Sequence, residues 1–600
     1  MDLKPRNLTK SIIFFIALMI TPKRCLTRPC VNLIPDCLLE IFSYLKYDRK
    51  TLFSCIRVNR LWCRLAIPIL WSSPFKYYSQ SYTYKIINTY ITCLNIQDKV
   101  ILKNLGLKNC LINMKSLFYY PRFLESFVID NYTLGLKKWV KENFQNENLL
   151  RAQQIVDNMM MDLIFNDNCS LKKFKYVNYI EISRIDFLKK LSNLNLSLIN
   201  TFEFLGHGYS KEMYSNILPK LFNQMSKTSR NIKHLSLYFP KTMSTKTMTT
   251  TTTTPTTSST TTLTNSTTSS TTMSTTFNYY MIDNNNLISI TENSDNSTDL
   301  DLSIINLIKS QNSLESFSTN EFWMKCSTEM IFNSLISHSN SLKFIKFFTL
   351  INFNQSFFKF IKQIHSLRTL EFKRFLFFEQ FDSTLSNMII PQNYLSQVQN
   401  IYLEERDIPY RLIDTIIRIT NHSLKKFYSR RINPIILSSI KSFCPNITHL
   451  HISLEKYSDL LLNIIKNLPL ISLYLQVRYI SLSLKSCLPN SLKFFGLDSE
   501  IDQVELEDLL NNSHLSNLLI MELLNISDIN ENFRNIFIKF NEKFNYTLKE
   551  LRLEKSLLKE FILLDKKELW NSRTFKINEV KNFKYTAYEE IFGSPYYKYT

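Results

Sequence analysis

Apolar residues recur at helical spacing near the start of the chain. Leu38, Ile41, Phe42 and Leu45 stand at positions i, i+3, i+4 and i+7, which predicts an apolar stripe along one face of a helix. Pro35 suits the first turn of that helix, because a proline there loses no hydrogen bond and its fixed φ angle already fits. The pattern therefore predicts an amphipathic helix that begins near Pro35.

Two more short helices are predicted directly after it. Asp48 can cap a helix that includes Leu52, and Asn59 can cap another that includes Trp62 and ends at Pro68. Three helices of this size cannot bury all their apolar surface among themselves. The surplus faces either the rest of the chain, as in a helical hairpin within a core, or a partner protein. Periodicity alone leaves both alternatives open.

A different pattern, L-x-x-L-x-L, recurs from about residue 170 onward. Its last two apolar positions alternate with polar ones, which predicts a half-buried strand. Amphipathic segments such as 412–419 and 460–468 precede most of these strands and predict helices. The first apolar position falls at residues 342, 367, 398, 424, 447, 470, 492 and 515. One helix and one strand in each period of about 20–30 residues predict a leucine-rich-repeat solenoid.

The predicted strands would line the inner face of this solenoid, where polar residues are candidates for binding a partner. These candidates are Lys343, Arg368, Lys425, His449 and His451. His449 and His451 project from the same strand face, because they are two residues apart. No Cys or acidic residue lies nearby at a metal-ligand spacing, so we expect an exposed pair and no metal site. The Asn or Cys that usually follows L-x-x-L-x-L is absent, so we expect an irregular solenoid.

Residues 242–276 interrupt the repeats with a tract made almost entirely of Ser and Thr. Such a tract buries too little apolar surface to offset the entropy of ordering it, which predicts disorder. The Asn- and Asp-rich residues that follow extend this segment to about 299, and repeat-like strands on both sides indicate an insertion within the solenoid. O-glycosylation, phosphorylation and an inert expanded tract are the alternatives for its role.

Composition narrows the function classes. The chain has 600 residues and a net charge of +21, but its basic residues are scattered singly or in pairs, so we expect no nucleic-acid partner. Only six glycines are present, and no nucleotide-binding, metalloprotease or EF-hand motif occurs, so no enzyme active site and no cofactor are predicted. Eleven cysteines without a C-x-x-C pair indicate no disulfide scaffold and fit a reducing compartment.

The N-terminal segment contains a short apolar run at residues 12–20, preceded by several basic residues. This run is far shorter than the roughly 20 residues needed to span a bilayer, so no membrane partner is predicted. A signal peptide and a short apolar helix that packs on the domain or frays are the alternatives. A small-residue cleavage site is missing and Lys23-Arg24 follow directly, which favours the helix.

Three short sequences within the predicted helices carry a family resemblance. They are D-C-L-L-E-I-F-S-Y-L at residues 36–45, V-N-R-L-W-C at 58–63 and I-L-W at 69–71. Together they make residues 31–72 resemble an F-box, although the family usually begins with Leu-Pro, which would place the proline at Ile34 instead of Pro35. With the repeats downstream, the chain resembles F-box proteins that carry a C-terminal leucine-rich-repeat domain.

This resemblance implies a non-catalytic subunit of a Skp–cullin–F-box ubiquitin ligase that acts in the cytoplasm and/or nucleus. The solenoid would bind a protein substrate of unknown identity. The F-box would bind a Skp-type adaptor, and through it cullin and RING subunits, by the apolar residues Leu33, Pro35, Leu38, Leu39, Ile41, Phe42, Leu45, Leu52, Val58 and Trp62. Alternatives are a leucine-rich-repeat scaffold without a ligase role and, less favoured, a secreted repeat protein.

The expected fold class is α/β, with helices first and helix–strand repeats after them. The expected order is an N-terminal segment at 1–30, a three-helix F-box at 31–75, a helical connector at 76–165, a solenoid at 166–566 and a Tyr-rich tail at 567–600. The disordered insertion at 242–299 would interrupt the solenoid.

Overall fold

The computed structural model describes most of the chain between residues 34 and 579. The predicted N-terminal segment and Leu33 lie outside the described residues, as does the predicted tail apart from residues 576–579. The described residues are 34–46, 48–76, 80–107, 116–144, 149–165, 170–178, 196–206, 216–239, 279–283, 286–290, 298–320, 328–349, 355–373, 394–404, 408–454, 458–511, 515–526, 533–545, 547–554 and 576–579.

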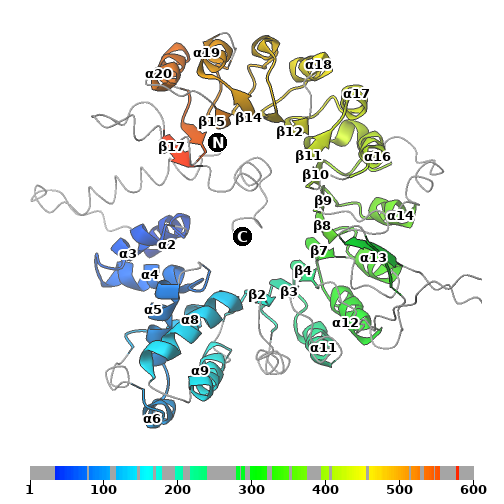
Figure 1. Cartoon of the computed structure of the whole chain (residues 1–600). Helices are drawn as coiled ribbons and strands as arrows, with labels where there is room; N and C mark the ends of the chain where they lie inside the picture. Colours follow the sequence, from blue (N-terminus) through cyan, green and yellow to red (C-terminus); the bar gives the residue numbers. More distant parts are fainter. Residues whose placement is uncertain are drawn as a thin grey trace, which may run out of the picture.

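A curved sheet of fifteen strands lines the inner wall of an open ring (Figure 1). Neighbouring strands are parallel and follow one another in chain order, so each repeat pairs with the repeat before and after it. These strands are β1 (Ser126–Val128), β2 (Lys173–Asn178), β3 (Thr201–Gly206), β4 (His234–Tyr238), β7 (Ser316–Asn320), β8 (Phe344–Thr349), β9 (Thr369–Phe372), β10 (Asn400–Leu403), β11 (Lys426–Ile432), β12 (His449–Leu454), β13 (Ser472–Val477), β14 (Phe494–Ile501), β15 (Ile520–Ile526), β16 (Glu550–Leu553) and β17 (Lys576–Glu579).

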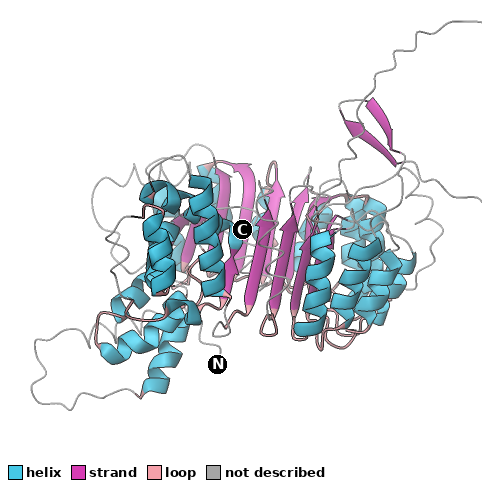
Figure 2. Cartoon of the chain, turned by 90° about the horizontal axis from the view of Figure 1, so that it is seen from below, coloured by secondary structure: helices cyan, strands magenta, loops and turns pink. Residues whose placement is uncertain are grey.

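Helices cover the outer wall of the ring and flank the sheet when it is seen from below (Figure 2). Among the described helices, none combines the length and apolar character required to cross a bilayer. The helices that precede the repeats are α2 (Pro35–Tyr44), α3 (Arg49–Cys55), α4 (Arg60–Trp71), α5 (Gln80–Thr92) and α6 (Ile96–Asn104). The helices of the repeats are α8 (Ile129–Asn143), α9 (Leu149–Ile164), α11 (Leu218–Thr228), α12 (Thr298–Lys309), α13 (Thr328–Ile336), α14 (Gln355–Gln363), α16 (Tyr410–Thr420), α17 (Pro434–Phe443), α18 (Asp459–Asn467), α19 (Gln503–Asn511) and α20 (Phe533–Lys543).

The core of the solenoid lies between the sheet and the helices. Strand residues such as Leu450 and Ile452 point into it and alternate with residues on the inner face. The first apolar position of each predicted repeat is fully buried, namely Leu342, Leu367, Val398, Leu424, Ile447, Leu470, Leu492 and Leu515. The predicted α/β solenoid, leucine-rich-repeat-like in its alternation of helix and strand, is therefore confirmed.

The structure departs from the predicted organisation in two places. The sheet begins at β1, inside the predicted connector 76–165, because three residues suffice to pair with β2 but are too few to show an alternating pattern. In the predicted disordered insertion, residues 240–278 lie outside the described residues, whereas β5 (Tyr279–Asp283) and β6 (Asn286–Ile290) pair antiparallel and α12 begins at Thr298. Because β4 pairs directly with β7, the insertion interrupts one solenoid, as predicted.

Candidate functional site

Helices α2, α3 and α4 form a small domain with a core of its own. Leu38 and Phe42 of α2, Leu52 of α3 and Trp62 of α4 all belong to this core and are at most 9% exposed. The rings of Phe42 and Trp62 meet edge to face with centroids 5.2 Å apart, an arrangement that aromatic pairs favour. The side chain of Trp62 therefore packs the helices together, as its place in the third helix predicts.

Local signals set the ends of these helices as predicted, with one exception. The side chains of Asp48 and Asn59 each accept a hydrogen bond from the backbone N–H three residues later, at 3.1 and 2.9 Å. The prediction that the third helix ends at Pro68 is wrong, because α4 continues through it to Trp71. Leu70 and Trp71 pack against the core, and their burial outweighs the backbone hydrogen bond that Pro68 cannot make.

The residues predicted to contact a Skp-type adaptor divide into two groups. Ile41 is half-buried, whereas Pro35, Leu39 and Val58 are exposed. The other described residues fill the core of the domain and not its surface, which corrects the prediction for Leu38, Phe42, Leu45, Leu52 and Trp62. The physical reason is that the regular apolar stripe of an amphipathic helix is the face that its own domain buries.

Several large apolar side chains nevertheless remain on the outside of this domain. Among the described residues, six of the nineteen strongly exposed large hydrophobic side chains fall within residues 34–61. Exposed apolar side chains concentrated in one small domain are candidates for contact with a partner. The apolar face, as we call it, consists of Ile34, Pro35, Leu39, Phe53, Val58 and Leu61.

Sequence reasoning missed three members of the apolar face. Ile34, Phe53 and Leu61 are 65%, 56% and 42% exposed. Leu61 lies directly beside buried Trp62 in the sequence, and Phe53 directly beside buried Leu52. An apolar residue that stands next to the core-facing stripe, where a polar residue is the usual choice, is the signal that could have identified them.

The three-helix domain is joined to the solenoid at Ser72 and Glu125. The carbonyl of Ser72 accepts hydrogen bonds from the backbone N–H groups of Glu125 and Ser126, at 2.8 and 2.9 Å. The Glu125 carboxylate pairs with Lys46 after α2 at 3.5 Å and with Lys172 before β2 at 2.7 Å. Burial alone would raise the pKa of Glu125, but the hydrogen bonds and charges of the two lysines outweigh it and lower the pKa. Glu125 therefore ties the domain to the first repeats.

A row of polar and aromatic side chains crosses the inner face of the sheet. Pairing register places one residue from each strand between β8 and β13 in line, and these are Lys346, Glu371, Tyr402, Tyr428, His451 and Tyr474, the central row. Lys346 and Glu371 form an ion pair of 2.6 Å, with their side chains 6% and 2% exposed. Burial lowers the pKa of Lys346 to about 8, although the charge of Glu371 acts in the opposite direction.

The prediction of an exposed histidine pair is wrong for His451, which is 2% exposed. The rings of Tyr428, Tyr474 and Phe494 lie around it at centroid distances of 6.3, 5.5 and 6.0 Å, and they exclude water. Burial lowers the pKa of His451 to about 3, with a smaller contribution from the charge of His449. His449 is half-buried, and burial lowers its pKa to about 4. Within the described residues, no cluster of His, Cys, Asp or Glu could hold a metal ion.

The other predicted substrate-binding residues lie at the edge of the sheet and not on its inner face. Lys343, Arg368 and Lys425 each stand one residue before a strand, at the starts of β8, β9 and β11, and all three are exposed. Because the strands are parallel, their amino ends share one edge. The structure therefore brings these three residues to one rim and separates them from His451.

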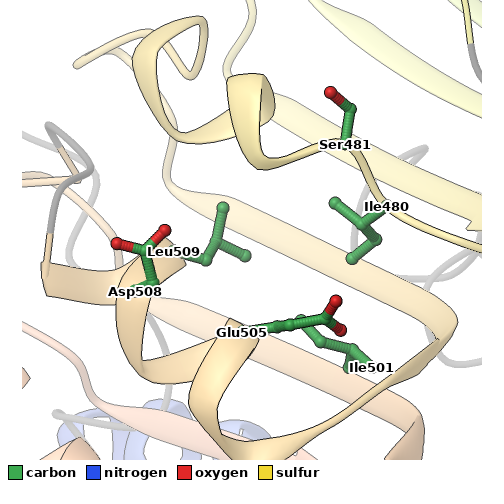
Figure 3. Close-up of a pocket in the computed structure, with 6 residues that line it drawn as sticks. All are labelled: Ile480, Ser481, Ile501, Glu505, Asp508 and Leu509. Atoms are coloured by element: carbon green, nitrogen blue, oxygen red, sulfur yellow. The ribbon is translucent and has the colours of Figure 1, made fainter.

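A small pocket lies between α19 and the loop before the 3₁₀ helix η6 (Leu482–Ser486). Figure 3 shows the six residues that line it: Ile480, Ser481, Ile501, Glu505, Asp508 and Leu509. The Asp508 carboxylate pairs with Lys485 at 2.7 Å.

A comparison with protein families bears on the N-terminal helices. A family model described as F-box-like matches residues 35–77, which span α2, α3 and α4. No curated protein matches the chain in sequence. Among solved structures, the chain is similar to a leucine-rich-repeat protein of Leptospira interrogans, at 13% identity over 46% of this chain and 91% of that chain, with a TM-score of 0.19. The chain thus carries an F-box-like domain at residues 35–77, followed by a leucine-rich-repeat-like solenoid.

Proposed function

We propose that this chain is a substrate-recognition subunit of a Skp–cullin–F-box ubiquitin ligase. One observation carries the proposal: the F-box-like domain completes a core of its own while the apolar face stays exposed. Helical interfaces of this kind concentrate their binding energy in a few apolar anchors that become buried in the complex. Phe53 and Leu39 are such anchors, and a Skp-type adaptor is the partner they bind.

In this proposal the solenoid binds a protein substrate, and catalysis belongs to the other subunits. The chain contributes proximity and orientation, since the contacts of Ser72 and Glu125 hold the F-box-like domain against the first repeats. The protein then acts in the cytoplasm and/or nucleus, bound through the adaptor to cullin and RING subunits. It needs no cofactor, and neither nucleic acid nor a membrane is a partner.

Co-purification with a Skp-type adaptor tests the proposal. The variant should change the apolar face and spare the core, so Leu39→Glu combined with Phe53→Glu is preferable to any substitution of buried Leu38. The matched control is Ile96→Glu combined with Val100→Glu, because these side chains are 82% and 49% exposed on α6. We expect the unchanged chain and the control to retain the adaptor, and the variant to lose it.

The same experiment separates the ligase subunit from a scaffold without a ligase role. A folded chain that retains no adaptor would contradict the proposal and favour the scaffold. Equal retention by the Leu39→Glu, Phe53→Glu variant would show that the apolar face is not the site. Circular dichroism of each purified variant establishes that it is folded.

A further inference from the structure

At the amino edge of the sheet, an exposed cation directly precedes four of the seven strands from β8 to β14. Lys343 precedes β8, Arg368 precedes β9, Lys425 precedes β11 and Lys493 precedes β14. All four side chains are exposed. We call them the basic rim. Strands in a sheet are about 4.8 Å apart, so the six steps from β8 to β14 spread these cations over about 29 Å.

The described segments that lead into β8 to β14 contain no acidic residue, and Glu315, which directly precedes β7, pairs with Lys343 at their border. The segments are 337–343, 364–368, 394–399, 421–425, 444–448, 468–471 and 487–493, and none contains Asp or Glu. Their other exposed positions include His365 and His422. From β9 to β14 the segments at this edge therefore carry charge of one sign, which raises the local concentration of anionic partners.

Internal contacts leave most of this charge available. Within the described part of the chain, Lys425 and Lys493 form no ion pair. Arg368 donates to main-chain carbonyls through Nη1 alone, which holds its guanidinium at the edge with Nε and Nη2 unengaged in the described contacts. Lys343 pairs with Glu315 at 3.4 Å, but its side chain is 62% exposed.

Stabilisation of the helices does not account for the basic rim. The carboxyl ends of helices favour nearby cations, because the helix dipole is negative there. The last turns of the repeat helices already contain cations of their own, namely Lys362 in α14, Arg418 in α16, Lys441 in α17 and Lys466 in α18. The basic rim adds a second cation beyond α14 and α16, at Arg368 and Lys425.

We propose that the basic rim binds an acidic segment of the protein substrate, an extended stretch rich in Asp and Glu. The identification of this segment as part of a substrate rests on the proposed ligase function. An extended chain covers about 29 Å with about nine residues. The described rim segments present no exposed aromatic ring on which bases could stack, and this favours a polypeptide over a single-stranded nucleic acid.

Fluorescence anisotropy with the full chain tests this binding. The probe is a labelled peptide of alternating Glu and Ser, about twelve residues long so that it spans the basic rim. We expect the peptide to bind, its affinity to fall steeply with added salt, and a peptide of alternating Gln and Ser not to bind. The variant Lys343→Glu, Lys425→Glu, Lys493→Glu should weaken binding by about tenfold or more.

The control variant is Lys85→Glu, Lys220→Glu, Lys359→Glu, which makes the same change of charge on exposed helix positions. It should change the affinity by less than about twofold. If the charge-reversed rim variant does not fold, Lys425→Gln with Lys493→Gln is used in its place and should still weaken binding by about fivefold. Equal binding by the rim and control variants would overturn the proposal.

Two further outcomes are decisive. A single-stranded DNA oligonucleotide of equal charge that binds more tightly than the peptide and displaces it would overturn the proposal in favour of nucleic acid. Adaptor co-purification on the same preparations separates this inference from the proposed function. Peptide binding without adaptor binding contradicts the ligase role alone, whereas adaptor binding without peptide binding contradicts the basic rim alone.

Discussion

The F-box-like domain and the solenoid differ in which kinds of side chain they expose and which they bury. The domain leaves Phe53 and Leu39 outside, whereas the solenoid buries Lys346 and Glu371 on the inner face of its sheet. A domain of about forty residues has more surface than it can bury, so apolar groups remain for a partner. Each repeat of the solenoid packs against a repeat on either side, so apolar residues find cover within the chain.

This difference indicates two kinds of recognition in one molecule. The domain is suited to bind by apolar contact, which depends little on salt. The solenoid presents exposed charge at the basic rim, and binding there weakens as salt rises. Substitutions of buried and of exposed residues in the two regions test this contrast directly.

The largest expected effect comes from the core of the F-box-like domain. Trp62→Ala removes the ring that packs against Phe42 and should destabilise the domain by about 4 kcal/mol. Leu61→Ala, one residue away and exposed, should change stability by less than about 0.5 kcal/mol. Hydrogen exchange of α2, α3 and α4 measures both effects. Equal protection in the two variants would contradict the assignment of Trp62 to the core and of Leu61 to the surface.

The buried ion pair of the central row should show the next largest effect. Lys346→Met leaves the Glu371 carboxylate buried without its cation and should cost about 3 kcal/mol. The double variant Lys346→Met, Glu371→Leu should recover most of that loss, because neither charge of the pair then remains. Urea unfolding measures the two free energies. A double variant as unstable as the single one would show that the pair stabilises the fold beyond neutralising its own charges.

Acid should weaken the solenoid through His451. Its pKa is lowered to about 3 in the folded chain, so between pH 6.5 and about 3 the unfolded chain binds a proton that the folded chain does not. Stability therefore falls as the pH falls through this window, by about 2–3 kcal/mol between pH 6.5 and 4. In urea unfolding at several pH values, His451→Phe should flatten this decline, and exposed His422→Phe should not. If the free energy of unfolding fell equally with pH in the unchanged chain and in both variants, His451 would not be a source of the decline.

The junction between the two regions should show the smallest effect. Glu125→Gln removes two partly exposed ion pairs and should cost less than about 1 kcal/mol at pH 7. Because the folded pKa of Glu125 is lowered, its contribution is present above the unfolded pKa of about 4.5 and disappears as the pH falls through the folded value. The difference that thermal unfolding shows at pH 7 should therefore shrink as the pH falls below about 4.5.

Periodicity predicted most of the fold because burial follows it. Leu342 and Leu424 stand at predicted repeat positions and are fully buried, and Asp48 and Asn59 cap helices as expected. A regular pattern of this kind reports which side of an element faces its own core. Short elements such as β1 give no such pattern and escape detection.

The candidate sites were harder to predict, for two physical reasons. Apolar periodicity cannot distinguish a face buried within the domain from one buried by a partner, and the resemblance to an F-box places Leu38 and Phe42 among the partner contacts although both lie in the core. Cations that are scattered along the sequence, such as Lys343 and Lys493, come to one edge only because the repeats stack. Charge that the sequence presents as dispersed is concentrated by the fold.

The most direct test of the central claim is the affinity of Phe53→Ala for a Skp-type adaptor, measured by calorimetric titration beside its free energy of unfolding. The Phe53 side chain is 56% exposed and outside the core, so we expect the affinity to fall by about tenfold or more. Its stability should change by less than about 0.5 kcal/mol. An unchanged affinity, or a loss of stability like that of Trp62→Ala, would contradict the claim that the apolar face is built for a partner.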